Sequence, residues 1–394
     1  MIRKTSIRLA GIIACSLTFL CLSGCWSARE MNDLEIVIGM GIDKAKEPGN
    51  ISLSAQIVKS GDMRNPSPEN GSSGNQAFWD VNGNGKSIFD AIREITRQSG
   101  NRLFVSHSQV LIFSKEIAAG GIDKYIDFFL RTHEMRPSTM IFISEDSAAA
   151  VLAVKPEKEK LPSMNIVKLI TATDLTSQAE KINLQQFSSR MMSKTAAPVA
   201  PLIKIENSGE TQHTFISGMA VFKDFKLAGI LDEDESRGLL WVTGGVKSGI
   251  IHVPAPGGDG MVILEINGAK SKVTPELKGD RLLMHIEVKE EASMTEQSTP
   301  ESLITAQAFE LMQKQQSEVI REDILRAFTI SKELHCDIFG FGELIRKKYR
   351  YAWKQMEPRW DELYPQIELV LDIKTRVRKT ELITKPVFSK EEQT

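Results

Sequence analysis

Alternating apolar and polar residues predict most of the strands in this chain. Residues 35–43 and 51–58 alternate in this way and are rich in β-branched side chains. The four residues between them at 47–50, Glu-Pro-Gly-Asn, are turn formers, so the two segments predict a hairpin. The same pattern predicts further strands over residues 105–113, 138–143, 214–222, 226–231, 249–253, 261–267, 282–288 and 367–377.

Helices are predicted where apolar residues recur every three or four positions. Ser87 can cap a helix that runs to about residue 99, because Asp90 stands three residues on in place of the usual capping-box glutamate. Gly100 then ends this helix. A longer amphipathic segment over 304–328 is expected to pack its apolar stripe on a core. Shorter helical segments are predicted over residues 122–130, 147–154, 236–242 and parts of 163–194.

Strands and helices therefore alternate along the chain, which favours an α+β fold, a mixed α/β body. The stretch "TAAPVAP" at 195–201 is typical of a linker, and "EEASMTEQSTPES" at 290–302 is a second polar break. Residues 60–85 predict a mobile loop, in which Phe78 and Trp79 alone are candidates for a fixed position, because 16 of these 26 residues are Gly, Ser, Asn or Pro.

The N-terminus has the pattern of a lipoprotein signal peptide. Three basic residues precede an apolar run at 9–22, which is the length of a secretory signal rather than of a membrane span. The run ends in "LSGC" at 22–25, which resembles a bacterial lipobox. This pattern predicts cleavage after residue 24, with a diacylglycerol and an N-acyl chain on Cys25 that attach the protein to a lipid bilayer. The alternatives are a plain signal peptide with a chance cysteine, or an uncleaved anchor.

Charge and cysteine content narrow the possible functions. The first 24 residues hold three of the 49 basic residues and none of the 51 acidic ones, so the remaining 370 residues have a net charge of −5. This charge disfavours nucleic acid as a partner. Cys15 and Cys21 would leave with the signal peptide, and Cys25 would be modified. Because Cys336 alone remains, the mature chain can form neither an internal disulfide nor a cysteine-based metal site.

The sequence contains no complete catalytic motif. The stretch "NGNGKS" at 82–87 lacks the first glycine of a phosphate-binding loop, because Asp80 holds that position. "GMG" at 39–41 lies within a strand pattern and lacks the third glycine of a dinucleotide site. None of the six histidines is three or four residues from another, and His107 between two serines is better explained as a strand residue. The sequence therefore predicts no catalytic residue, no cofactor and no metal.

Two charged runs have structural explanations. The acidic run at 232–235 is expected to cap the helix that follows, because a helix N-terminus favours negative charge. The run "RKKYRYAWK" at 346–354 mixes basic and aromatic residues, a mixture that can stack on nucleic acid. A solvated helix face is the preferred interpretation, with contact to lipid headgroups or an acidic partner as the functional alternative.

Four stretches together resemble the Ger(x)C family, the C subunits of endospore germinant receptors. They cover 24–44, 106–137, 218–242 and 337–365, in order along nearly the whole mature chain. A departure is Ser27, where family members often have Asp. The residues that match the two terminal signatures are Cys25, Trp26, Glu30, Asn32, Gly41, Ile42, Asp43 and Lys44, and then Asp337, Gly340, Gly342, Trp353, Trp360 and Pro365.

The resemblance implies a lipoprotein on the outer face of the inner spore membrane, held by Cys25 and assembled with the receptor's A and B membrane subunits. It also implies three mixed α/β domains, each a sheet with flanking helices. With the breaks above, these would be an N-terminal domain at 25–200, a β-rich middle domain at 201–292 and a C-terminal domain at 293–394. The glycines and tryptophans of the late signature are expected to be structural.

Two other classes of protein remain as alternatives. A lipid-anchored solute-binding protein of a transporter would have two similar lobes and a pocket that binds a small ligand alone. A lipid-anchored hydrolase would need a nucleophile or a metal site, and the sequence offers neither pattern.

Overall fold

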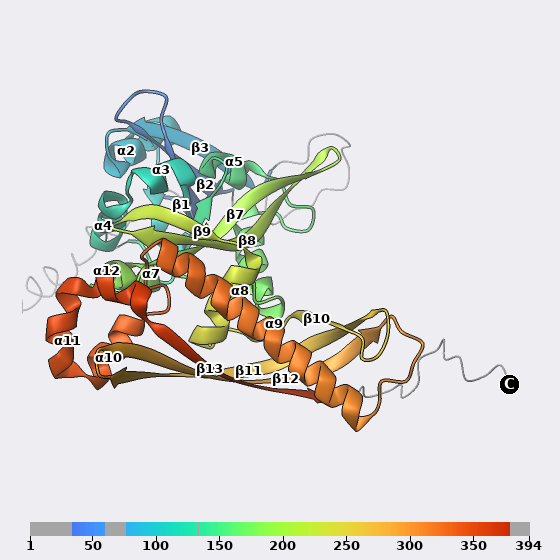
Figure 1. Ribbon diagram of the computed structural model, residues 1–394. Helices are drawn as coiled ribbons and strands as arrows, with labels where there is room; N and C mark the ends of the chain where they lie inside the picture. Colours follow the sequence, from blue (N-terminus) through green and yellow to red (C-terminus); the bar gives the residue numbers. More distant parts are fainter. Residues whose placement is uncertain (1–33, 60–75, 133, 379–394) are drawn as a thin grey trace, which may run out of the picture.

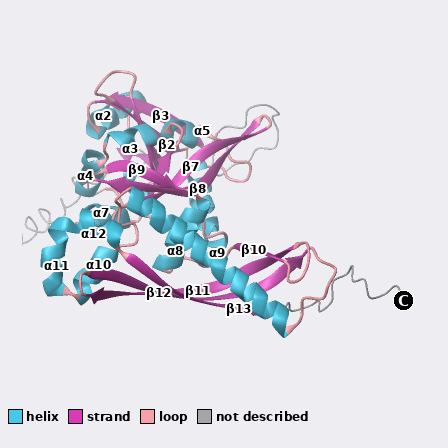
Figure 2. Ribbon diagram, viewed as in Figure 1, coloured by secondary structure: helices cyan, strands magenta, loops and turns pink. Residues whose placement is uncertain are grey.

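The computed structural model describes residues 34–59, 76–132 and 134–378, and Cys25 lies outside this part of the chain. Two β-sheets carry the strands of the described residues, and helices pack between and around them (Figures 1 and 2). One sheet has nine strands and the other has four. The predicted mixed α/β architecture is confirmed, with two sheets where three were expected.

The nine-stranded sheet is parallel at its centre and antiparallel at both sides. Its order is β3-β2-β1-β5-β6-β7-β8-β9, with the short β4 beside the start of β1. β1, β5, β6 and β7 run parallel, while β2–β3 and β8–β9 are antiparallel additions. The strands are β1 (Leu34–Lys44), β2 (Ile51–Val58), β3 (Phe78–Gly85), β4 (Arg102–Phe104), β5 (Val110–Ser114), β6 (Met140–Ser144), β7 (Val199–Ser208), β8 (Thr211–Lys223) and β9 (Lys226–Leu231).

Helices cover both faces of this sheet, so its central strands are largely buried. Every residue of β5, "VLIFS", is buried, as expected for a parallel strand with two covered faces. A Cβ atom on Gly39 of β1 would lie 2.1 Å from Ser163 Oγ of α6, so helix packing explains the glycines of "GMG". The helices are α2 (Ile88–Ser99), α3 (Lys115–Gly120), α4 (Asp123–Arg131), α5 (Ala148–Ala153), α6 (Pro162–Ala172) and α7 (Leu184–Met191), with short 3₁₀ turns at Val105–His107 and Thr173–Leu175.

The predicted β1–β2 hairpin and the predicted helix after Ser87 are both confirmed. β1 and β2 pair antiparallel, with Lys44 opposite Ile51 across the turn. The Ser87 side chain accepts from the Asp90 backbone N–H, and the Asp90 carboxylate accepts from the Ser87 N–H. Gly100 follows in the left-handed conformation at φ 78°.

Two local predictions were wrong. Within the predicted loop 60–85, residues 78–85 form β3 and pair with β2, while residues 60–75 lie outside the described chain. The glycines misled because a Cβ on Gly83 would lie 2.3 Å from the Ala91 carbonyl oxygen of α2, so they serve packing rather than a loop. The predicted strand 105–113 is interrupted, because Val105–His107 form a 3₁₀ turn before β5 begins.

The four-stranded sheet is a long twisted ribbon with helices on one face. Its order is β10 (Ile250–Pro254), β11 (Met261–Lys278), β12 (Arg281–Gln297) and β13 (Glu368–Arg378), with β13 parallel to β12. Helices α8 (Glu233–Thr243) and α9 (Ala306–Glu333) lie on one face, and no helix covers the other in the described chain (Figure 2). The alternating burial along β12 follows from this one-sided cover.

The last helices connect α9 to β13 at the end of this ribbon that lies nearest the nine-stranded sheet (Figure 1). They are α10 (Phe341–Lys348), α11 (Arg350–Met356), the 3₁₀ turn Glu357–Arg359, α12 (Trp360–Leu363) and the 3₁₀ turn Tyr364–Gln366.

Helices α8 and α9 are joined by a buried ion pair. The Arg237 guanidinium of α8 donates to both carboxylate oxygens of Asp323 in α9, at 2.7 and 3.2 Å. The Trp241 indole N–H donates to the same carboxylate at 3.1 Å. Because this carboxylate has three donors, its burial at 4% exposure leaves no charge unpaired.

Strand pairing crosses both predicted domain boundaries. The predicted linker 195–201 contains the start of β7, which pairs with β6, so the first sheet continues past residue 200. β12 crosses residue 292 and pairs with β13 from the predicted third domain. A division by strand pairing instead falls between β9 and β10, with α8 packed beside α9.

Candidate functional site at the junction of the two sheets

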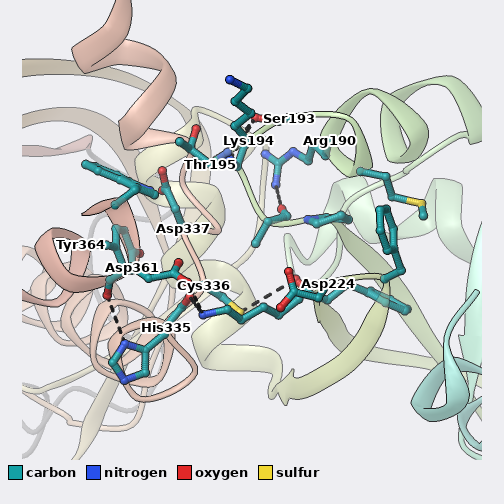
Figure 3. A pocket seen from close by; sticks show the side chains of 18 residues that line it. Arg190, Ser193, Lys194, Thr195, Asp224, His335, Cys336, Asp337, Asp361 and Tyr364 are labelled. Carbon is teal, nitrogen blue, oxygen red and sulfur yellow. Dashed lines mark hydrogen bonds and ion pairs between the residues drawn. The ribbon is translucent and has the colours of Figure 1, made fainter. Parts of the chain in front are cut away.

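Four of the six matching residues of the late signature, Asp337, Gly340, Gly342 and Trp360, lie where the two sheets meet. We call this region the junction; it comprises residues 190–198 and 222–225 from the first sheet's side and residues 335–342 and 360–364 from the second. A pocket of about 280 Å³ lies within it, lined by both sides (Figure 3). In Figure 3 Arg190, Ser193 and Asp224 approach it from one side, and Asp337, Asp361 and Tyr364 from the other.

Asp337 is the central buried group of the junction. It is 3% exposed, and its carboxylate accepts from the backbone N–H groups of Phe341 at 2.9 Å and Gly342 at 2.8 Å. These are the first two residues of α10, so Asp337 stabilises the N-terminus of that helix. Burial raises the pKa of Asp337 to about 6, although these backbone donors and Arg190 oppose the rise.

The backbone of Asp337 also joins the two sides. Its carbonyl oxygen accepts from the Ala197 N–H at 2.9 Å, just before β7, and Ala196 forms an isolated parallel bridge with Asp337. Asp337 therefore accepts hydrogen bonds from both sides of the junction. Its carboxylate accepts from the N–H groups of α10 on the second side, and its backbone carbonyl accepts from the Ala197 N–H on the first side.

Arg190, near the end of α7, makes a second connection between the sides. Its Nη1 donates to the carbonyl oxygens of Ala197 at 3.2 Å and Ile338 at 3.0 Å. Burial lowers the pKa of Arg190, while the carboxylates of Glu180 and Asp337 act in the opposite direction. The guanidinium thus bridges backbone from both sides and lies in the field of the buried Asp337 carboxylate.

The signature glycines are required by backbone geometry at the same place. Gly340 has φ 73°, a left-handed conformation that glycine adopts without a steric penalty, and it precedes α10. A Cβ on Gly342 would lie 2.7 Å from the Thr195 Cβ, which is closer than packed side chains approach. The prediction that these glycines are structural agrees with both observations.

The signature tryptophans belong to an aromatic cluster of which Trp360 and Tyr364 line the pocket. Trp353 and Trp360 are each 4% exposed and meet edge to face, with ring centroids 5.2 Å apart. Trp360 also contacts Tyr364, whose hydroxyl is 2.8 Å from the Ser331 hydroxyl of α9. This cluster packs the helices after α9 together, as the structural interpretation of these tryptophans predicts.

Charged groups on the rim of the pocket are paired with one another. Lys223 Nζ donates to the His335 carbonyl oxygen at 3.1 Å and lies 3.2 Å from the Asp361 carboxylate. Asp224 and Phe225 form the β8–β9 turn with φ of 47° and 66°, as a two-residue hairpin turn with both central residues left-handed.

The chemistry available at the junction is that of packing and hydrogen bonding. Cys336 lies in the pocket lining, but burial raises its pKa to about 11, so its thiol is not poised as a nucleophile at neutral pH. Within the described ranges, no group of three or more His, Cys, Asp or Glu side chains could hold a metal ion.

Asp43 of the early signature does for α5 what Asp337 does for α10. It ends the apolar part of β1, and its carboxylate accepts from the N–H groups of Ala148 at 2.8 Å and Ala149 at 2.9 Å. The Ser147 side chain accepts from the third, that of Ala150. Burial raises the pKa of Asp43, and the backbone donors oppose the rise.

Other residues singled out in the sequence lie away from the junction or outside the described chain. Cys25, the predicted lipid attachment site, and Trp26 lie outside the described residues. His107 lies in a 3₁₀ turn rather than in a strand, so that interpretation was wrong. Asp232 accepts from the Glu235 N–H and caps α8, as predicted.

The basic run 346–354 is only partly a solvated face. Tyr351 is 88% exposed, but Trp353 is buried and Lys348 donates to the Pro275 carbonyl oxygen at 2.7 Å. The run therefore attaches the end of α10 to β11 as well as facing water.

Arg190 and Thr195 were not predicted from the sequence as residues of this site. Arg190 is the basic residue of the last turn of α7, a common position for a cation, so its sequence context was unremarkable. The signal in the sequence was a basic residue on a short amphipathic helix just before a predicted linker, but only the fold brings Arg190 to Ile338.

No helix among the described residues is long and apolar enough to cross a bilayer.

Comparison with known protein families gives matches over most of the chain. Residues 27–205 match the family described as "Spore germination protein N-terminal domain". Residues 217–381 match the family described as "Spore germination B3/ GerAC like, C-terminal". The change from one family to the other falls within β7 and β8 of the first sheet, not at a gap between sheets.

Curated relatives from Bacillus subtilis (strain 168) match over nearly their whole length. "Spore germination protein KC" is 25% identical over 94% of this chain and 95% of the relative. "Spore germination protein B3" is 22% identical over 91% and 94%, respectively. A solved structure, "Crystal Structure of the GerBC protein", matches with a TM-score of 0.58 at 18% identity, over 86% of this chain and 96% of that one. This last match shows a shared fold.

Proposed function

Because the chain belongs to the Ger(x)C family of spore germination proteins, we propose that it is the C subunit of a nutrient germinant receptor of bacterial endospores. In this proposal lipid chains on Cys25 hold the body on the outer face of the inner spore membrane. There it assembles with the receptor's A and B membrane subunits as a non-catalytic assembly and signalling subunit.

The observation that carries this proposal is the use of the signature residues at the junction. Asp337, Gly340 and Gly342 hold α10 against the chain before β7. Trp353 and Trp360 pack the helices beside it. The signature residues of this chain thus fix two sheets relative to each other and do not surround a substrate site. This use of the signature suits a subunit that presents surfaces to partners.

The lipobox at 22–25 supports attachment to a membrane. A single acyl chain binds a bilayer only marginally, whereas two or more chains, at about 0.8 kcal/mol per buried CH₂, attach a protein stably. A diacylglycerol and an N-acyl chain on Cys25 would therefore be enough without a spanning helix.

The test is a Cys25→Ala substitution in spores that depend on this receptor for their response to nutrients. We expect the variant chain to fold, to lack acylation and to lower nutrient-triggered germination strongly. Cys21→Ala is the matched control, because it removes a cysteine four residues earlier without changing residue 25, and it should leave acylation and germination intact. Normal germination by Cys25→Ala spores would contradict the proposal.

The alternative function is that of a lipid-anchored solute-binding protein, and the junction pocket is the observation in its favour. Two of its cationic lining groups are already paired, because Arg190 donates to two carbonyl oxygens and Lys223 to another beside Asp361. Calorimetry of the chain with nutrients separates the two functions. Tight binding of a nutrient without partner subunits would favour the alternative.

A further inference from the structure

The four-stranded ribbon has one face that no helix of the described chain covers (Figure 2). Helix α8 contacts β8 of the first sheet as well as β11 of the ribbon, so the helix-covered face is turned toward the first sheet and the uncovered face away from it (Figure 1). Thr375 of β13 donates its hydroxyl hydrogen to the Gln313 carbonyl oxygen of α9 and therefore faces the helix. Because side chains alternate along a strand, Lys374 and Arg376 project from the uncovered face.

Three lysines lie side by side on the uncovered face. Lys270 of β11 is directly opposite Lys289 of β12, which is directly opposite Lys374 of β13. All three residues are exposed. Like charges that are directly opposite each other on neighbouring strands destabilise a sheet. Proteins carry local costs of this kind mainly at functional surfaces.

A hollow of about 550 Å³ adjoins this row of lysines. The three lysines line it together with Gly268, Glu291 and Arg376, which form the next row across the same strands. None of the described residues of α9 lines the hollow, so it opens on the uncovered face. Gly268 leaves it open, because a Cβ atom at this position would have no neighbour among the described residues within 4 Å.

Acidic neighbours neutralise only part of the charge of this face. Lys289 Nζ lies 2.8 Å from a Glu287 carboxylate oxygen, and Lys374 Nζ lies 2.7 Å from one of Asp372. Exposed ion pairs of this kind are weak. Over the Lys270 row and the row on either side of it, five basic residues stand against three acidic ones, whereas residues 25–394 carry a net charge of −5. The basic residues are Lys270, Lys272, Lys289, Lys374 and Arg376, and the acidic ones are Glu287, Glu291 and Asp372.

We propose that this cationic face binds the phosphate headgroups of anionic lipids at a bilayer surface. Lysine and arginine side chains are attracted to the negative potential of such a surface. A sheet face presents several of them at once to a plane of headgroups. Contact through this face lays the ribbon along the bilayer and turns the first sheet away from it.

Exposed apolar side chains on the same face favour lipid over an acidic protein segment. Val370 of β13 is 40% exposed and stands four residues before the lysine of that strand. Ile250 of β10 is 52% exposed and lies in one row with Glu265 and Ser293 across three strands. Ser293 is four residues after Lys289, so this row shares its face. An acidic segment would be matched by charge alone, whereas binding at a bilayer interface combines charge attraction with apolar contact.

The inference goes beyond the proposed lipid anchor and does not rest on it. The lysines attract anionic headgroups whether or not Cys25 carries acyl chains, because they belong to the folded ribbon.

The direct test measures how fast individual lysines of the full chain are acetylated on vesicles, by mass spectrometry. One set of vesicles is phosphatidylcholine alone, and the other also contains phosphatidylglycerol. We expect Lys270, Lys289 and Lys374 to react several-fold more slowly on the anionic vesicles, and salt at about 1 M to remove the difference. Lys46, which is exposed in the β1–β2 turn, is the internal control and should react equally on both.

Three results would overturn the proposal. Equal rates for the three lysines on both kinds of vesicle would show that the face does not meet the lipid. Equal slowing by inorganic phosphate added to phosphatidylcholine vesicles would assign the hollow to a free phosphate. Slowing only in the presence of partner subunits would assign the face to an acidic protein surface.

A second measurement compares two triple variants in the Cys25→Ala chain, which removes the acylated residue from all of them. Lys270→Gln, Lys289→Gln and Lys374→Gln together should weaken binding to the anionic vesicles on the order of a hundredfold, at roughly fivefold per lysine. The matched control changes three exposed lysines elsewhere, Lys46→Gln, Lys115→Gln and Lys314→Gln, and should leave binding within about twofold. Equal losses in both variants would contradict a localised face.

The outcomes separate this inference from the proposed function. A chain without acyl chains whose ribbon lysines are protected on anionic vesicles would refute the lipid anchor alone. An acylated chain whose ribbon lysines react equally on both kinds of vesicle would refute the headgroup contact alone.

Discussion

The end of β1 and the junction use the same device, a buried aspartate at the start of a helix, with different consequences. Asp43 accepts two N–H groups of α5, which lies on the strand's own sheet. Asp337 accepts two N–H groups of α10 while its backbone bonds to Ala197 across the junction. The first stabilises one sheet locally, and the second determines how two sheets are placed relative to each other.

The buried carboxylate of Glu290 lacks backbone donors of this kind, and its pKa is raised further than that of Asp337. Glu290 of β12 is 2% exposed and neither of its oxygens makes a hydrogen bond of normal geometry in the described chain. Its pKa is raised to about 8 by burial, which the nearby Gln316 of α9 only partly opposes. The comparison indicates that backbone donors at helix starts limit how far burial raises the pKa of a carboxylate, since Asp337 rises to about 6 and Glu290 to about 8.

The largest effect is expected for Asp337→Ala. It leaves two buried N–H groups without an acceptor and removes a carboxylate that favours the charged form of Arg190, so we expect a loss of about 3 kcal/mol or more in the free energy of unfolding. Chemical denaturation measures this loss. Limited proteolysis should show new cleavage within residues 190–198, and unchanged cleavage there would contradict the role assigned to the junction.

Asp337→Asn sharpens this test through its pH dependence. The folded-state pKa of about 6 lies above the ordinary value of 3.8, so ionisation of Asp337 opposes folding. Wild-type stability is therefore expected to fall as the pH rises from about 4 to about 6 and then to level off. The asparagine variant cannot ionise and should lack this component. Identical pH profiles for both proteins would contradict the buried position of the carboxylate.

A smaller effect is expected for Asp43→Ala. The substitution removes the acceptor of two N–H groups of a six-residue helix, one of them only partly buried, so we expect a loss of about 1–3 kcal/mol. Hydrogen exchange should quicken in α5 and leave the junction unchanged. Faster exchange in α10 as well would show that the two regions are not independent.

Ser147→Ala, which removes the cap of Ala150 alone, should cost about 1 kcal/mol.

An effect of opposite sign is expected for Glu290→Gln. Because the folded-state pKa is raised from 4.5 to about 8, the folded protein keeps a proton that the unfolded chain releases, and wild-type stability falls as the pH rises between these values. The neutral glutamine removes this component, so we expect the variant to be more stable than the wild type at pH 8. The gain should vanish at about pH 4.5, and a gain that is constant with pH would contradict the assignment.

The local pattern of the sequence predicted individual strands and helices better than it predicted how they pair and pack. The hairpin at 35–58 and the Ser87 cap depend on neighbours in the chain, and both were confirmed. β3 was missed because Gly83 and Gly85 are typical of loops, while their purpose is the close approach of α2. The linker interpretation of 195–201 failed at β7, because its pairing with β6 depends on residues more than 50 positions away.

The junction could be predicted only in part for the same reason. Asp337, Gly340 and Gly342 were singled out by resemblance, and Trp353 and Trp360 were expected to be structural. Arg190 was not found, because its partners Ala197 and Ile338 are brought together by the fold. The contribution of Asp43 to α5 was likewise hidden, since Ala148 lies 105 residues further along the chain.

The central claim is that a lipidated Cys25 holds this body at a membrane beside its receptor partners. The most direct test is the intact mass and N-terminal fragmentation of the native protein isolated from spores in detergent. We predict a chain that begins at residue 25 and carries a diacylglycerol and an N-acyl chain on that residue. A native N-terminus at any other residue, or an unmodified Cys25, would contradict the account.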